Sequence, residues 1–172
     1  FAGFIVGSGT VQVGTGGSGG ALGNVTNLPT RLYTSGTLII NRNNTLTVNQ
    51  GFEGGGLVKL TGSVTVNTGS VQSSAANLEI GAGTTFALIG TSGLNQANWW
   101  GGAITNNGAI SLTYAKLSSN ISGSGTLTSS SGSNVLTGTN TYSGTTTINA
   151  ASGIEVGTSS TPTTGSLGTG PV

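Results

Sequence analysis

The sequence has no cysteine, histidine, methionine or aspartate, and charged residues occupy only 4% of its 172 positions. Without cysteine, no disulfide framework can hold the fold together. Without histidine, cysteine or aspartate, the usual nucleophile–base triads cannot be built. Hard metal ions need several carboxylate oxygens, but the three acids, Glu53, Glu79 and Glu155, are far apart in the sequence. We therefore expect no enzymatic activity, no cofactor and no metal site.

The scarcity of basic residues and of long apolar runs also argues against binding to nucleic acid and insertion into a membrane. Phosphate binding requires clustered basic side chains, whereas Arg31, Arg42, Lys59 and Lys116 are scattered, so we expect no nucleic acid partner. A membrane helix needs roughly 20 consecutive apolar residues, and no run approaches that length, so we expect no membrane insertion by this segment. The chain begins at Phe1 without a signal-like segment, and we interpret it as a processed or excised piece of something longer.

Glycine is abundant, with 33 residues, and it often stands at the start of a short recurring motif. A small turn residue and a small polar residue are followed by alternating apolar positions, as in Gly36–Ile40, Asn44–Val48 and Gly62–Val66. Alternation with a period of two, bounded by Gly and Asn, predicts half-buried strands. No segment has a convincing helical period, so the sequence predicts an all-β fold.

The motif recurs at a roughly constant interval, for example from Leu46 to Val64 and from Val64 to Phe86. Recurrence on that scale is typical of stacked coils, in which each coil buries its apolar row against its neighbours. Two insertions, around Gly14–Gly20 and Thr91–Gly102, favour an irregular parallel β-helix (β-solenoid). The residues predicted to face inward are Val11, Val13, Leu38, Ile40, Leu46, Val48, Val64, Val66, Leu78, Ile80, Phe86, Leu88, Ile110, Leu112, Ile148, Ile154 and Val156.

An antiparallel β-sandwich is the alternative architecture, because short strands at intervals of about 8–12 residues suit that fold as well. In particular, the two predicted strands within Gly36–Val48 are separated only by Asn41, Arg42 and Asn43, so they could form a hairpin.

The C-terminal third resembles the passenger-associated repeat of bacterial autotransporters. The matching stretch runs from Leu136 to Ile148, with Asn140-Thr141-Tyr142-Ser143-Gly144 at its centre, and Gly165–Val172 follows it. The resemblance covers residues 123–172. It implies a right-handed parallel β-helix in a secreted or surface-displayed bacterial protein. The rest of the chain matches only in composition and strand rhythm, and we expect residues 1–172 to form a single β-solenoid segment.

We therefore expect a non-catalytic extracellular structural or adhesive β-solenoid on a bacterial cell surface, either a stalk segment or a fibre subunit. The ends of such a stack expose unpaired backbone groups, and the apolar segment Phe1–Val6 lacks the charges that normally protect an edge. Phe1, Phe4, Ile5 and Val6 are the predicted self-assembly edge. The expected partner is a second copy, stacked end to end, or the remainder of a longer chain, and surface glycans are a further candidate.

The alternative function is a carbohydrate-binding or degenerate carbohydrate-active β-helix. It depends on Trp99 and Trp100, since neighbouring strand residues face opposite sides and one ring should be exposed for stacking on a sugar. The competing interpretation is that the pair fills the core, because Trp is usually buried. Glycoside hydrolysis normally needs two nearby carboxylates, and Glu53 and Glu79 could lie on neighbouring coils of a solenoid. Solvated outer positions are favoured instead, because Glu is mostly exposed and alternation places Glu79 and Glu155 on the outside.

A glycine fingerprint and a set of Thr-x-Thr pairs each resemble a known binding motif, but a structural explanation is simpler for both. Gly14–Gly19 fits the G-x-G-x-x-G fingerprint of dinucleotide-binding proteins, but no helix or ribose-binding acid follows it, so we interpret it as a loop. Thr-x-Thr pairs at 45/47, 126/128 and 145/147 are of the kind that binds ice on flat solenoids, but their spacing is irregular and their strand contexts differ. The preference of Thr for strands accounts for them more simply.

Overall fold

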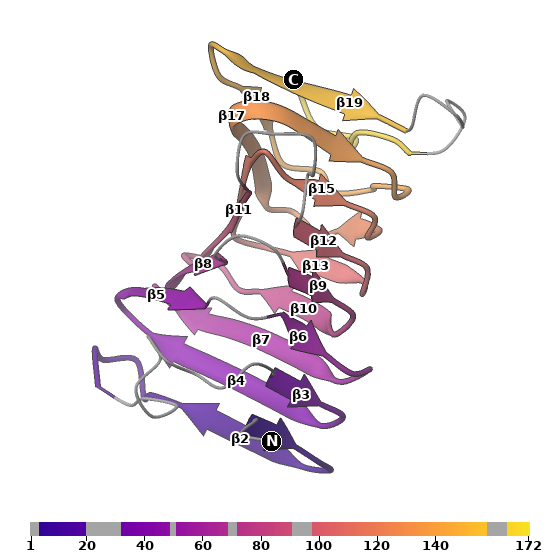
Figure 1. Ribbon diagram of the computed structural model, residues 1–172. Helices are drawn as coiled ribbons and strands as arrows, with labels where there is room; N and C mark the ends of the chain where they lie inside the picture. The colour runs from indigo at the N-terminus through magenta and orange to yellow at the C-terminus, as the bar shows by residue number, and fades with distance from the viewer. Residues whose placement is uncertain (1–3, 20–31, 49–50, 69–71, 91–97, 158–164) are drawn as a thin grey trace.

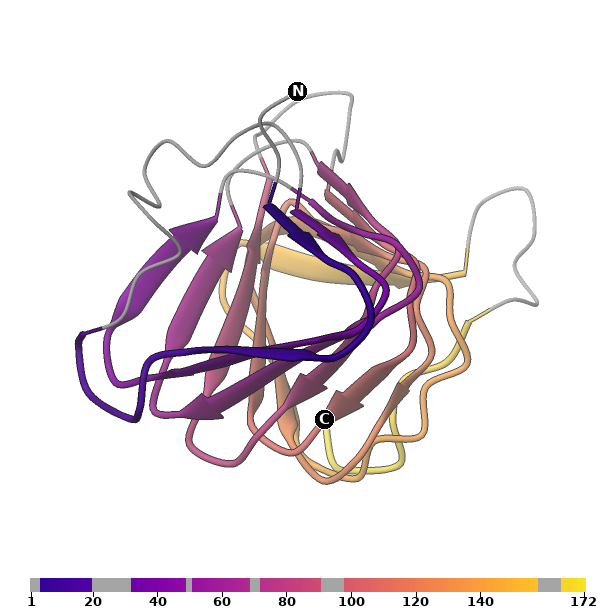
Figure 2. The same ribbon diagram turned by 90° about the horizontal axis from the view of Figure 1, so that it is seen from below.

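The computed structural model of the chain is a parallel β-solenoid (Figure 1). It contains no helix among its described residues, which are 4–19, 32–48, 51–68, 72–90, 98–157 and 165–172. Five successive turns have strands on all three sides of the rod, and partial turns lie at each end. Seen along its axis, the rod is a three-sided prism (Figure 2). A cluster of buried hydrophobic side chains fills its interior.

The strands form three faces, which we name A, B and C in the order in which the chain visits them. Face A contains β1 (Phe4–Val6), β3 (Leu32–Thr34), β6 (Phe52–Glu53), β9 (Gln72–Ser74), β12 (Asn98–Trp100), β15 (Lys116–Leu117), the C-terminal half of β17 (Thr126–Leu136) and β19 (Ser152–Val156). Face B contains β2 (Thr10–Val13), β4 (Thr37–Arg42), β7 (Leu57–Gly62), β10 (Asn77–Ile80), β13 (Ile104–Asn106) and β16 (Ile121–Ser122). Face C contains β5 (Thr45–Val48), β8 (Thr65–Thr68), β11 (Thr85–Ile89), β14 (Ala109–Thr113), the N-terminal half of β17 and β18 (Thr146–Ile148).

The predicted recurrence of apolar rows is confirmed by the strand register. On face B, Leu38, Val58 and Leu78 are direct neighbours on successive coils, and their intervals in the sequence are equal. Beyond them, Ile104 and Ile121 continue the same row after coils of different length. Because each row meets a similar row on either side, the inward side chains of the inner coils are covered by their neighbours.

The register differs from the sequence prediction at one position. Leu46 pairs with Val66, and Val66 pairs with Phe86, so the first rows on face C repeat at the same interval as those on face B. Val64 is fully buried, as expected, but it precedes β8 and is not the partner of Leu46. Val64 and Val66 are close in the sequence and both apolar, so spacing alone could not decide between them.

The antiparallel alternative is wrong. All the strand pairs in the described part of the chain are parallel, which a closed antiparallel sandwich cannot produce. The proposed hairpin within Gly36–Val48 is also absent, because β4 and β5 belong to faces B and C. Residues Asn43 and Asn44 form the corner between these two faces.

Most of the predicted inward residues are confirmed as core. They are Val13, Leu38, Ile40, Leu46, Val48, Val64, Val66, Leu78, Ile80, Phe86, Leu88, Ile110 and Leu112. The four exceptions lie in the terminal coils. Val11, Ile148 and Val156 are exposed by 37%, 44% and 37%, and Ile154 is partly buried against the core.

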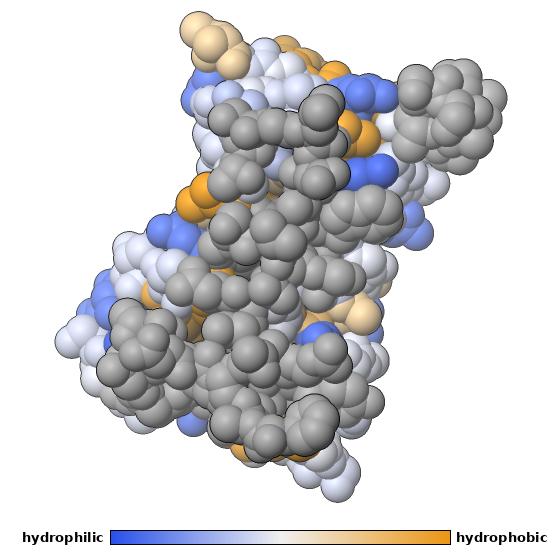
Figure 3. Space-filling view, viewed as in Figure 1, coloured by the Kyte–Doolittle hydropathy of each residue, from blue (hydrophilic) through white to orange (hydrophobic). Residues whose placement is uncertain are grey.

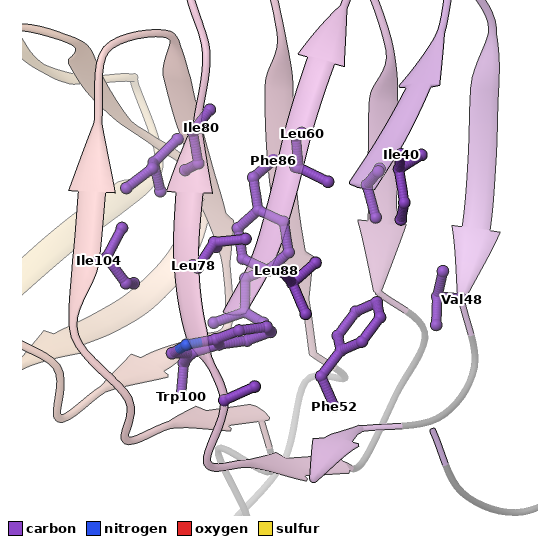
Figure 4. Packing of buried hydrophobic residues seen from close by; sticks show 14 of the residues in the cluster. Ile40, Val48, Phe52, Leu60, Leu78, Ile80, Phe86, Leu88, Trp100 and Ile104 are labelled. Carbon is purple, nitrogen blue, oxygen red and sulfur yellow. The ribbon is translucent and has the colours of Figure 1, made fainter. Parts of the chain in front are cut away.

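An aromatic cluster fills the centre of the prism. Trp100, on β12, has no exposed surface and packs against Phe52 and Phe86, with ring centroids 5.7 and 5.2 Å apart (Figure 4). These rings come from faces A and C of different coils, so they join coils as well as faces. Among the described residues, no helix is long and apolar enough to cross a membrane.

Candidate binding surfaces

Of the two adjacent Trp residues, only Trp100 has a described side chain, and that side chain lies in the core. Trp100 lies in the aromatic cluster, so its ring is not accessible and cannot stack on a sugar. The interpretation that this Trp fills the core is therefore correct. Trp99 occupies β12, with its backbone between those of Ser73 and Lys116, but its side chain lies outside the described residues.

The predicted N-terminal edge coincides with the first strand of face A. β1 pairs with β3 on one side only, so its other side is a strand edge among the described residues. Ile5 is exposed by 69%, whereas Val6 is buried in the core. The strand includes the backbone of Phe4, but its side chain lies outside the described residues, as does the whole of Phe1. Hydrophobic surface is visible at this end of the rod (Figure 3).

The opposite end has a second apolar edge, whose side chains the sequence predicts to lie inside the core. Val156 on β19 pairs with the fully buried Leu136, so it occupies an inward position. Ile148 on β18 likewise pairs with the buried Ser129. Both side chains are exposed because, within the described chain, no further coil covers them. Alternation in the sequence identified their direction correctly, but it could not show that they lie in the last coil.

The carboxylates do not come together. Glu79 on face B forms a salt bridge with Lys59 on the neighbouring coil, with 2.7 Å between Oε1 and Nζ, and both side chains are about one-third exposed. Glu53 and Glu155 lie on face A, several coils apart. Among the described residues, no group of three or more acids, His or Cys is arranged to hold a metal ion.

The glycine-rich segment Gly14–Gly19 is a loop packed against the corner that follows β4. The amide of Gly16 donates to the carbonyl of Asn41 at 2.9 Å, and the Arg42 guanidinium donates to the carbonyl of Ser18 at 2.7 Å. A Cβ on Gly14 would overlap the Asn41 carbonyl, and its φ of +81° also favours glycine. The segment therefore has a packing role in the structure.

The residues that match the repeat bind successive coils together. Asn140 is buried, accepts from the Ile121 amide at 2.9 Å and donates to the Ser166 carbonyl at 2.6 Å. Tyr142 is fully buried, and its hydroxyl lies 2.7 Å from that of Thr146. A buried side-chain amide that hydrogen-bonds to both neighbouring coils fixes their register. If one coil shifted along its strand direction, the amide would be left without a partner, at a cost in free energy.

The three Thr-x-Thr pairs are aligned, so the prediction that they belong to different strand contexts is wrong. β5, β17 and β18 all belong to face C, and the register places the three pairs at equivalent outward positions. Unequal coil lengths hide that equivalence in the sequence. The coil from Thr85 to its ladder partner Ala109 is longer than the coil from Ala109 to Thr126, so the positions that follow no longer match a constant repeat.

Comparison of the chain with family models, with curated proteins and with solved structures gave no match.

Proposed function

We propose that this chain is a non-catalytic structural rod of a bacterial cell surface, a stalk segment or fibre subunit that joins other coils end to end. The observation that carries the proposal is the exposure of inward ladder positions at the two ends. Val11 on β2 pairs with the buried Leu38, yet 37% of it is exposed, and Val156 has the same exposure at the other end. The same apolar rows that hold the interior together are therefore uncovered at both ends.

The parallel ladders make the two ends complementary. On face A, β1 at one end and β19 at the other each have a strand neighbour on one side only among the described residues. On face C, the amide of Thr146 on β18 donates to the carbonyl of Pro171 in the C-terminal segment. A head-to-tail contact between such ends is heterologous, and repetition of it gives an open fibre rather than a closed ring. Strand addition supplies main-chain hydrogen bonds, and the apolar rows supply specificity.

Low surface charge supports this proposal. Only seven residues of the whole chain are charged, and the described surface in Figure 3 has no large field of strongly hydrophilic side chains. Charged residues on an edge normally prevent edge-to-edge association. The extracellular location is proposed from the resemblance of residues 123–172 to the passenger-associated repeat. Immunolabelling of intact, non-permeabilised cells that express the complete gene tests the location.

Sedimentation velocity over a wide concentration range, with negative-stain electron microscopy, tests the fibre form. We expect linear assemblies whose length rises with concentration. Val156→Lys, which places a charge on the uncovered row, should prevent assembly. Glu155→Lys is the matched control, because this neighbouring side chain is exposed and points away from the row. A monomer at all concentrations, or equal assembly by both variants, would reject the fibre form.

The alternative, a carbohydrate-binding module, depends on Trp99, since the buried Trp100 cannot contribute. A glycan array compares the unmodified chain with Trp99→Ala. Binding that is lost in this variant would favour the module, and no binding by either protein would remove it.

A further inference from the structure

The outward positions of face C form two ranks, each of which runs from coil to coil along the rod. Each position in a rank is the direct ladder neighbour of the next, from β5 through β8, β11, β14 and β17 to the segment that contains β18. Rank 1 consists of Thr45, Thr65, Thr85, Ala109, Thr126 and Thr145, and rank 2 consists of Thr47, Asn67, Ala87, Ser111, Thr128 and Thr147. Threonine fills eight of these twelve positions, and the other four side chains are small and uncharged. One of the four, Ala87 in rank 2, is buried.

The eight threonines of the two ranks lie on the outward side of face C. They alternate with core residues such as Leu46 and Val66, and all eight are exposed or half-buried. None of the eight hydroxyls donates to or accepts from another described residue, although hydroxyls elsewhere in the described chain, such as those of Thr84 and Ser119, do. Each therefore keeps its hydrogen-bonding capacity for groups outside the protein.

Charge is segregated away from this face. Glu53, Lys116 and Glu155 lie on face A, and Lys59 and Glu79 lie on face B. Arg42 ends β4 on face B and is buried. Of the described charged residues, none lies on a strand of face C. Face C therefore differs from the other two faces in having no charged side chain on its described strands.

The ranks also have a fixed spacing in two dimensions. Neighbouring strands lie about 4.7–4.9 Å apart, and residues i and i+2 of one strand lie about 6.6–6.8 Å apart. The first distance is close to a repeat of the oxygen atoms in hexagonal ice. Threonine is β-branched and stiff about χ1, so its methyl and hydroxyl groups hold their positions before anything binds. A pre-organised array loses little entropy on binding.

We propose that face C binds the surface of ice. The rank hydroxyls hydrogen-bond to water molecules at lattice spacing, and the rank methyl groups order the water between them. An extended polysaccharide is the other occupant that an array of hydroxyls could accept. Sugar binding usually adds aromatic side chains, and the ranks contain none, so ice is favoured. The inference is independent of the end-to-end assembly proposed above.

Incorporation of the fluorescently labelled, purified chain into a slowly growing ice hemisphere tests the proposal, together with thermal hysteresis. The disrupting variant is Thr85→Tyr, which places a bulky ring at the centre of rank 1, between Thr65 and Ala109. The matched control is Thr105→Tyr on face B, an exposed strand threonine between Glu79 and Ser122. We expect incorporation by the unmodified chain and by Thr105→Tyr, and a several-fold loss in Thr85→Tyr.

A gain-of-function variant makes the test sharper. Ala109→Thr fills the only position in rank 1 without a hydroxyl, and it should raise thermal hysteresis, whereas Ala82→Thr, at an exposed turn outside the ranks, should not. Circular dichroism checks that each variant is folded. Exclusion of the folded, unmodified chain from ice, equal effects of Thr85→Tyr and Thr105→Tyr, or Thr85-dependent retention on insoluble cellulose in place of ice would each overturn the proposal.

Discussion

Replacement of Leu78 by alanine is the most direct probe of the stacked rows. Leu78 is 1% exposed and lies in the middle of face B, between Val58 on one coil and Ile104 on the next. Since both neighbours are fixed in strands, the coils cannot close the space that the substitution leaves. A buried Leu→Ala change in such a site costs about 3–4 kcal/mol, from the lost transfer energy and the cavity together.

Urea unfolding followed by circular dichroism measures this loss. With an m value of about 2–3 kcal/mol/M, the midpoint should fall by roughly 1–2 M. Glu79→Ala is the matched control on the adjacent, outward position. It removes a salt bridge whose partners are 36% and 34% exposed, so its effect should stay below about 1 kcal/mol. Equal midpoints for the two variants would refute the inward and outward assignment of face B.

Three further predictions use the same assay. Gly138→Ala should strongly destabilise the fold, because the added Cβ would overlap a carbonyl of the preceding coil, whereas Gly153→Ala, with open space around it, should be close to neutral. Equal effects of the two variants would contradict the close packing of coils. Asn140→Ala should cost about 2–3 kcal/mol, because it leaves backbone groups of two neighbouring coils unsatisfied; an unchanged midpoint would show that the buried amide is not needed. Val64→Asp should unfold the stack locally, since an unpaired buried charge costs several kcal/mol, while Thr65→Asp on the outer face should be much milder; similar losses would mean that the register is wrong.

The sequence was sufficient for the fold class and for most of the core. Alternation with a period of two identifies inward residues without knowledge of their partners, so Leu38, Ile40, Leu78 and Ile80 were predicted correctly. The near-constant spacing of equivalent apolar residues in the first coils also identified the stacked architecture.

The ends of the rod could not be predicted, because burial at an inward position depends on whether another coil covers it. Val11 and Val156 have the same local pattern as Leu38 and Leu136, yet they are exposed. The distinction depends on the position of a coil in the stack, which local alternation does not encode.

The threonine ranks were missed for a different reason. Thr45, Thr65 and Thr85 recur at equal intervals, and that regularity was available in the sequence. Between β11 and β17 the coils change in length, so the alignment of Thr126 and Thr145 with this series depends on the ladder register. Buried polar residues such as Asn140 were missed as core because their burial requires hydrogen-bond partners from neighbouring coils, which lie far away in the sequence.

The central claim is that successive coils stack along one axis in parallel register. Spin labels on face C test it by pulsed electron paramagnetic resonance, with Thr45→Cys paired in turn with Thr85→Cys, Thr126→Cys and Thr145→Cys. Because these positions lie two, four and five strands from Thr45, the distances should increase steadily to about 24 Å at five strand spacings. Distances that do not rise with strand number, or a Thr45–Thr145 pair as close as the Thr45–Thr85 pair, would contradict the account.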